Sequence, residues 1–170
     1  TESDTYWTST TEIIDSKLSY PDMALMGIEV DAKEFGNQMP SREYDLYLSI
    51  IDVPSNYNPR TRKYSGIWDG TFKKSWTDNP AWVFYDLATH PVVGAGIPYV
   101  DKWTLYQISQ YCDELVPDGN GGMEPRFTFN SVFSAQEDAM SALSTLASAF
   151  RGMVYWGSDT AVPVADRPMD

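Results

Sequence analysis

Residues 78–91 read DNPAWVFYDLATHP and predict a helix whose start and end are both marked in the sequence. Asn79 is a favoured N-cap residue, and a proline directly after it occupies the first helical position, where its missing N–H costs nothing. Pro91 ends the segment because proline cannot continue the helical hydrogen bonding. A helix over 81–90 is therefore expected.

Two more helices are predicted further along the chain. The second begins after an Asp101 cap and runs down to Pro117. Its apolar stripe is formed by Trp103, Ile108, Tyr111, Cys112 and Leu115. The third begins at a capping box of Ser134 and Glu137 and ends at Gly152. Its apolar stripe is formed by Ala139, Leu143, Leu146, Ala147 and Phe150.

Strands are predicted on the N-terminal side of these helices. Two alternating apolar runs over 23–35, with a change of phase near Gly27, predict a strand with a bulge. A second strand is predicted over 43–53, and Pro54 ends it by withdrawing a ladder donor. Its apolar positions alternate with polar ones and are Tyr44, Leu46, Leu48 and Ile50.

Strands are also predicted between and after the last two helices. Residues 126–133 alternate, with Phe127, Phe129 and Phe133 as the apolar positions. Residues 153–156 and 161–165 flank a Gly-Ser-Asp turn and predict a terminal hairpin. Because strands and helices do not alternate regularly, the sequence predicts an α+β fold with mixed or antiparallel strands and about three helices.

The 170 residues are expected to form one α+β domain, since a chain of this length buries enough surface for a core of its own. The first residue is Thr1, so we expect a piece of a longer protein, with a loose N-terminal segment over 1–20. Residues 54–79 are dense in turn formers and indicate a long irregular connection or one short hairpin. They also carry Tyr57, Tyr64, Trp68, Phe72 and Trp76. These rings either pack beneath the connection or are exposed for binding to a partner, and we favour packing.

The net charge is −12, from 12 basic and 24 acidic residues, and argues against binding to nucleic acid phosphates or to anionic membranes. Residues 60–74 invert this balance, with 5 basic residues and 1 acidic residue. Short charge clusters are commonly solvated loops, and that is the simpler interpretation. The alternative is a contact with another copy of the chain, which presents a complementary acidic surface.

No catalytic or metal-binding pattern emerges from the residues that most often supply one. His90 precedes Pro91 at a predicted helix end, where a cation interacts favourably with the helix dipole. Cys112 lies in a helical stripe, where a thiol is buried and inert, and as the only cysteine it forms no internal disulfide. The segment from Asp118 begins like a calcium loop but lacks the glycine and glutamate of an EF-hand. No cofactor or metal is expected.

Carbohydrate chemistry is the remaining enzymatic or binding alternative. The chain has 6 Trp, 11 Tyr and a carboxylate excess, which are the residue types that a sugar-binding cleft uses. Glycoside hydrolysis also needs two carboxyl groups at a set separation across a cleft, and a sequence does not show such a separation.

Three segments carry a resemblance to a known family. Residues 49–87, beginning SIIDVPSNYNPRTRKYSGIWDG, residues 101–130, beginning DKWTLYQISQYCDEL, and residues 146–170, beginning LASAFRGMVYWG, closely resemble the central part of the tail tip (host specificity) J proteins of lambda-like siphophages and prophages. The resemblance runs from about residue 20 to the end in one register. In this family receptor recognition belongs to a distant C-terminal part, which these residues do not match.

The resemblance implies a hub-like structural domain of the phage tail tip. Its expected partners are other copies of the full-length chain, as a homotrimer closing the tail tube, and neighbouring tail tip proteins. The expected location is the virion, after synthesis in the bacterial cytoplasm. DNA passes nearby without being bound, membrane binding by this part is not expected, and no catalytic residues are transferred. The basic residues and two nearby tryptophans are the predicted subunit contact, namely Arg60, Arg62, Lys63, Trp68, Lys73, Lys74 and Trp76.

Overall fold

The computed structural model describes residues 26–27, 33, 41–44, 47, 49–132, 138–157 and 160–166. The chain divides into two compact units, Thr1–Asp45 and Leu46–Asp170, and nearly all of the described residues belong to the second. The predicted loose segment over 1–20 and almost all of the predicted strand over 23–35 lie outside the described residues. A single domain over the whole chain therefore stays a prediction.

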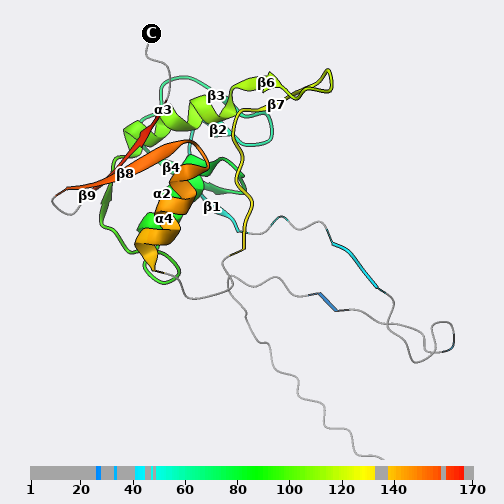
Figure 1. Ribbon diagram of the computed structural model, residues 1–170, viewed down its shortest axis with the longest axis horizontal. Helices are drawn as coiled ribbons and strands as arrows, with labels where there is room; N and C mark the ends of the chain where they lie inside the picture. The colour runs from blue at the N-terminus through cyan, green and yellow to red at the C-terminus, as the bar shows by residue number, and fades with distance from the viewer. Residues whose placement is uncertain are drawn as a thin grey trace, which may run out of the picture. The chain divides into compact units, whose positions relative to one another are not determined.

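The second unit combines helices with short, mostly antiparallel strands, which confirms the predicted α+β class (Figure 1). The helices are α2 (Pro80–Thr89), α3 (Lys102–Asp113) and α4 (Ala139–Ser148). Both predicted caps at the first two helices are confirmed. The Asn79 side chain accepts a hydrogen bond from the Ala81 N–H, and the Asp101 side chain accepts from the N–H groups of Trp103 and Thr104.

The other helix boundaries differ from the prediction. Helix α3 ends at Asp113, and residues 115–117 form a strand instead of a last helical turn. Ser134 and Glu137 lie outside the described residues, and the N-cap of α4 is Asp138, whose carboxylate accepts from the Ser141 N–H. A capping box at Ser134 was the wrong prediction because an aspartate four residues later supplies the cap.

The predicted helical stripes are correct at most positions and wrong at three. Ile108, Cys112 and Leu143 are buried, as are Leu146, Ala147 and Phe150. Trp103, Leu115 and Ala139, predicted as core positions, are exposed, whereas Leu105 is buried and was missed. Trp103 and Ala139 lie in the first turn of their helices, and Leu115 lies beyond the end of α3 in a strand.

Within the described residues, the strands form four small sheets. Strand β1 (Ile51–Pro54) pairs with β4 (Phe72–Ser75), and β2 (Tyr57–Asn58) pairs with β3 (Lys63–Tyr64), both antiparallel. Strand β6 (Leu115–Pro117) pairs antiparallel with β7 (Met123–Pro125). In the three-stranded sheet, β9 (Thr160–Ala165) lies between β5 (Tyr99–Val100), to which it is parallel, and β8 (Gly152–Gly157), to which it is antiparallel.

Two strand predictions are corrected and one is confirmed. In β1 the buried face is formed by Ile51 and Val53, while Ile50 is 65% exposed, so the predicted alternation has the opposite phase. Residues 126–132 form no strand, and the strand of this region is β7. The terminal hairpin is confirmed by β8 and β9, whose predicted turn residues, 158–159, lie outside the described residues.

The core lies where helix α2 packs against α3, α4 and β1. Its largest fully buried side chains include Trp82, Tyr57 and Phe84. Trp68 is also buried, and Tyr64 and Phe72 pack against the same cluster. Tyr57, Tyr64, Trp68 and Phe72 are therefore packed beneath their own segment, as favoured from the sequence, while Trp76 is not part of this cluster. That segment contains the β2–β3 hairpin and strand β4.

Candidate subunit-contact surface

The predicted contact residues lie in the β2–β3 hairpin, in the loop that follows it, and in or directly after strand β4. In the hairpin, Pro59 and the left-handed backbone of Arg62, with φ at 55°, turn the chain between the strands. The Asn58 side-chain oxygen accepts hydrogen bonds from the N–H groups of Arg60 and Thr61. This side chain satisfies two loop donors and holds Arg60 on the exposed outer side.

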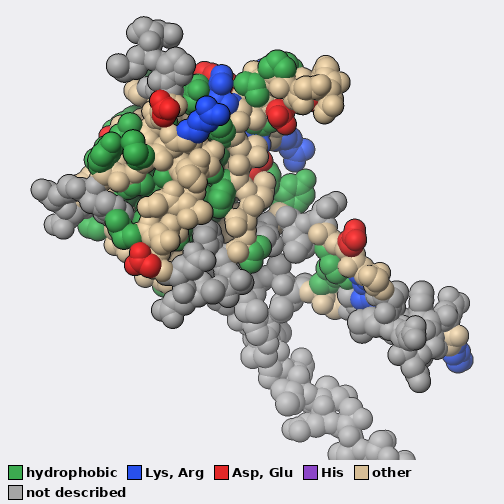
Figure 2. Space-filling model, viewed as in Figure 1, with side chains coloured by type: hydrophobic (Ala, Val, Ile, Leu, Met, Phe, Trp, Pro, Cys, Tyr) green, Lys and Arg blue, Asp and Glu red, His purple; other side chains and the backbone are tan. Residues whose placement is uncertain are grey.

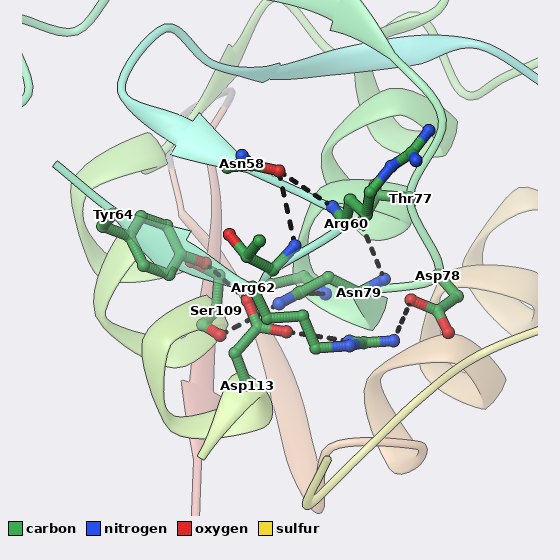
Figure 3. A network of polar contacts seen from close by, with 11 residues as sticks. Asn58, Arg60, Arg62, Tyr64, Thr77, Asp78, Asn79, Ser109 and Asp113 are labelled. Carbon is green, nitrogen blue, oxygen red and sulfur yellow. Dashed lines mark hydrogen bonds and ion pairs between the residues drawn. The ribbon is translucent and has the colours of Figure 1, made fainter. Parts of the chain in front are cut away.

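Arg62 points inward and bridges two carboxylates (Figure 3). Its Nη1 lies 2.9 Å from Asp113 Oδ1 and its Nη2 lies 2.5 Å from Asp78 Oδ1. The exposed fractions of the side chains are 18% for Arg62 and 3% for Asp113. Burial works to lower the pKa of Arg62, but the hydrogen bond to Asp113 and the charge of Asp78 outweigh it and raise this pKa. Arg62 is thus a permanent cation inside the fold.

The Asp113 carboxylate is shared with Tyr64. The Tyr64 hydroxyl donates to Asp113 Oδ2 at 2.9 Å and lies 2.9 Å from Ser109 Oγ. Burial, followed by the charge of Asp113, raises the pKa of Tyr64 well above its ordinary value. Asn79, the cap of α2, donates from Nδ2 to the Ser109 carbonyl oxygen at 2.9 Å. One buried network therefore ties the hairpin to the C-terminal half of α3 and to the start of α2 (Figure 3).

Trp68 is a core residue. Its Nε1 donates to the Thr71 carbonyl oxygen at 2.6 Å, and its ring stacks on Tyr106 with 4.9 Å between centroids. Lys102 donates to the Gly70 carbonyl oxygen at 2.9 Å, and its Nζ lies 5.7 Å from the Trp68 ring centroid. This ring is therefore occupied by neighbours from its own chain.

Three further predicted residues are Lys73 and Lys74, which lie in β4, and Trp76, which directly follows it. Lys73 Nζ donates to the Ser55 carbonyl oxygen at 3.1 Å, and Lys74 forms an ion pair with Asp52 at 3.2 Å. The Trp76 ring is half-buried and makes an edge contact with Tyr47, with 5.0 Å between centroids.

The structure therefore divides the predicted contact residues into two groups. Arg62 and Trp68 serve the fold of their own chain. The exposed cations are Arg60, Lys63, Lys73 and Lys74. Sequence reasoning missed Asp78 and Asp113 as the partners of Arg62. A usable signal was present for Asp113, because it neighbours Cys112 on the buried side of a helix, where an aspartate needs a positive partner.

Side chains that commonly act in catalysis have structural roles here. His90 Nδ1 accepts hydrogen bonds from the N–H groups of Val92 and Val93 and closes the turn after α2. Cys112 is buried, and burial raises the pKa of its thiol to about 12. Asp118 accepts from the N–H groups of Asn120 and Gly122 within its own loop. Over the described ranges, no three His, Cys, Asp or Glu side chains gather in a way that suits a metal ion.

Comparison with known proteins agrees with the resemblance noted from the sequence. No protein-family model matches the chain. The tip attachment protein J of Escherichia phage SECphi27 is 44% identical over 164 residues, which are 94% of this chain and 14% of that protein. The protein of the same name from Escherichia phage SECphi4 is 44% identical over 165 residues, again 14% of its length. The chain thus spans about one seventh of these relatives. None of the helices in the described part is long and apolar enough to cross a membrane.

Proposed function

This chain is homologous to one segment of phage tip attachment protein J, and from that premise we propose that it is a structural part of a phage tail tip. The observation that carries the proposal is the 44% identity over 94% of the chain. At this identity over so long a stretch, the fold and its place in the assembly are expected to be shared. The proposed location is the distal end of the virion tail, after synthesis in the host cytoplasm.

We propose that the role is mechanical and not catalytic. Three side chains of types that often act in catalysis or binding are engaged within the fold. His90 closes a turn, Cys112 is buried, and the charge of Arg62 is matched by Asp78 and Asp113. The relatives are named for attachment of the tip, which also supports a structural role.

We further propose that the full-length protein forms a homotrimeric hub around the end of the tail tube. In such a ring, the net charge of −12 prevents adhesion of the DNA that passes outward, because carboxylates repel phosphates. The exposed cations Arg60, Lys63, Lys73 and Lys74, with Trp76 beside them, are the proposed contact with a neighbouring acidic subunit. Arg62 and Trp68, predicted for the same contact, act in this proposal by holding the hairpin and strand β4 in place.

The carbohydrate-binding alternative is less well supported by the positions of the aromatic residues. Trp68 and Trp82 are buried, and Tyr57 stacks on Tyr64 within the core. Much of the aromatic content is therefore used for packing. A screen of the purified chain for glycan binding and glycan hydrolysis separates the two functions, because the tail tip role predicts neither.

The location is tested by electron microscopy of particles from the phage or induced prophage that encodes this chain. Gold-labelled antibodies raised against the chain are expected to bind the distal end of the tail, opposite the capsid. Quantitative mass spectrometry of the same particles is expected to give three copies per tail. Label on the capsid or along the tube, or absence of the chain from purified particles, would overturn the proposal.

A further inference from the structure

The β6–β7 hairpin projects from the body of the second unit and ends in a turn over residues 118–122, called the tip loop below (Figure 1). The tip loop reads Asp-Gly-Asn-Gly-Gly, and both Asn120 and Gly121 are exposed. Figure 2 shows the same projection, with backbone and uncharged polar atoms predominating at its end. Water therefore has direct access to the Asn120 side chain.

Asn120 is the one asparagine in the sequence that glycine follows, whereas the others precede Gln, Tyr, Pro or Ser. Asparagine is a thermolabile residue, because its side-chain amide is open to attack by the backbone nitrogen of the next residue. Glycine leaves that nitrogen least crowded, since it has no Cβ. At an Asn-Pro pair the attack does not occur, because the proline nitrogen carries no proton. Asn120 is therefore the asparagine whose neighbour favours this reaction most.

The backbone on both sides of Asn120 is free to change its conformation. Gly119 and Gly121 have φ at 79° and 92°, and a Cβ added at either would meet no other part of the described chain within 4 Å. Glycine adopts a wide range of backbone angles at little cost. The rotation that brings the Gly121 nitrogen to the Asn120 side chain is thus sterically open.

One side chain restrains this loop. Asp118 Oδ1 accepts hydrogen bonds from the N–H groups of Asn120 at 2.7 Å and Gly122 at 2.8 Å. These bonds lower the pKa of Asp118, and the N–H of Gly121 contributes less strongly in the same direction. The carboxylate is therefore ionised at neutral pH and lies close to all three N–H groups. Its charge opposes loss of the Gly121 amide proton, and its hydrogen bonds oppose rotation of the backbone.

We propose that Asn120 is a site of spontaneous deamidation and that Asp118 sets its rate. In the first step the Gly121 nitrogen gives its proton to a hydroxide ion and forms a bond to Asn120 Cγ. The bond from Cγ to Nδ2 breaks, and the departing nitrogen takes a proton from water and leaves as ammonia, which regenerates hydroxide. A succinimide ring joins the two residues.

In the second step water adds to one of the two carbonyl groups of the ring, and the bond from that carbon to the Gly121 nitrogen breaks. The nitrogen regains a proton. Opening at Cγ leaves aspartate, and opening at the backbone carbonyl leaves isoaspartate, in which the chain runs through the former side chain. Overall, an amide and water give a carboxylic acid and ammonia, without oxidation or reduction.

Both products alter the tip loop. Each adds a carboxylate beside Asp118, and isoaspartate also lengthens the backbone between residues 120 and 121. The pattern of N–H groups that Asp118 holds is then lost. In a virion the protein is not renewed, so the altered loop accumulates as the particle ages. This last consequence alone rests on the proposed function.

The site is tested on the purified, folded chain kept at pH 8 for several days. Mass spectrometry of proteolytic peptides measures deamidation, and protein isoaspartate methyltransferase labels isoaspartate. Conversion is expected at Asn120 and is expected to be slower at Asn130, which is also exposed but precedes serine. Isomerisation of Asp118 leaves the mass unchanged, so the mass gain identifies deamidation. The variant Asn120→Gln is expected to lose the product. No conversion at Asn120, or equal conversion at Asn120 and Asn130, would overturn the site.

The role of Asp118 is tested by substitution. Asp118→Ala is expected to raise the rate of conversion at Asn120 by about tenfold, because the reaction no longer requires hydrogen bonds to a charged acceptor to break. The matched control is Glu124→Ala, which removes one negative charge from the same hairpin and leaves the hydrogen bonds to Asp118 in place. It is expected to leave the rate unchanged. Near-UV circular dichroism shows that both variants are folded. Equal rates in Asp118→Ala and the unaltered chain, or equal acceleration by both substitutions, would overturn the role of Asp118.

These outcomes are separate from those that test the proposed function. The conversion is measured on the purified chain, so a gold label away from the tail tip rejects the proposed location and leaves the deamidation site standing. Absence of conversion in a chain that is found at the tail tip rejects the site and leaves the location standing.

Discussion

Arg62 Nη1 lies 2.9 Å from Asp113 Oδ1, across 51 positions of sequence, and joins the β2–β3 hairpin to the end of α3. Arg62 adopts a left-handed backbone with φ at 55°, which costs about 1 kcal/mol or more for a residue with a side chain. The two carboxylates that receive its guanidinium offset this cost. The hairpin that carries the exposed Arg60 and Lys63 is therefore positioned by Arg62, whose side chain is largely buried.

Asp113→Asn is expected to lower the free energy of unfolding by about 2 to 3 kcal/mol, because it leaves Arg62 with one carboxylate and takes the charged acceptor from Tyr64. The measurement is urea unfolding of the purified chain at pH 7. The control is Glu114→Gln at the next position, where the ion pair with Arg126 is exposed and is expected to contribute less than about 1 kcal/mol. Equal effects of the two substitutions would show that Asp113 does not hold the hairpin.

Gly70→Ala tests the packing around Trp68. Gly70 has φ at 84°, and an added Cβ would lie 2.9 Å from Lys102 Nζ and 3.3 Å from the Trp103 ring. Gly66→Ala is the matched control, with φ at 67° and no atom within 4 Å of the added Cβ. Each substitution is expected to lower the free energy of unfolding by about 1 to 2 kcal/mol through its strained backbone. The decrease is expected to be larger for Gly70→Ala, because Lys102 must also leave the carbonyl oxygen to which it donates. A smaller loss at Gly70 than at Gly66 in urea unfolding would contradict this packing.

Asp86→Asn is expected to stabilise the chain at neutral pH. Burial is the main cause that raises the pKa of Asp86, and the nearby His90 and Lys74 only partly oppose it. A raised pKa in the folded state means that stability is full below the unfolded value of about 3.9 and is lost as the pH rises through the folded value. The gain from Asp86→Asn should therefore be present at pH 7 and absent at pH 3. Thermal unfolding at both pH values measures the gain in stability. An equal gain at both would show that burial of the charged Asp86 carboxylate is not its cause.

Cys112 is expected to resist alkylation in the native chain. Burial raises the pKa of its thiol to about 12, so almost none of it is thiolate at pH 8, and the side chain has no exposed surface. Iodoacetamide should label Cys112 at pH 8 only after urea unfolding, as read by mass spectrometry. Rapid labelling without urea would show that the packing of α3 opens in the native state.

Much of the fold is readable from short patterns. The Asn79-Pro80 start of α2 and the Asp101 start of α3 were predicted because the capping hydrogen bonds are made within three residues. The last turn predicted for α3 was wrong because the apolar stripe continues through Leu115, which instead enters a strand and stays exposed. An apolar stripe in the sequence shows where apolar residues recur. It does not show which of them will be buried against another part of the chain.

The candidate contact surface was only partly predictable for the same reason. The charge inversion over 60–74 is visible in the sequence. The separation of Arg62 from Arg60 and Lys63 is not visible, because it depends on a carboxylate 51 positions away. The apolar face of the β6–β7 hairpin likewise arises only when strand pairing sets Leu115 and Pro117 opposite Pro125 and Met123.

Short patterns along the chain were enough to predict the α+β class, the starts of two helices, the terminal hairpin, and the resemblance to a phage tail tip protein. These follow from interactions between residues close along the chain, or from the order of residues itself. Which basic residues face solvent, and which apolar residues remain exposed, became known only from the folded chain. Exposure and ion pairing depend on side chains that folding brings together from distant positions. These long-range contacts cannot be predicted from patterns within a few residues of the chain.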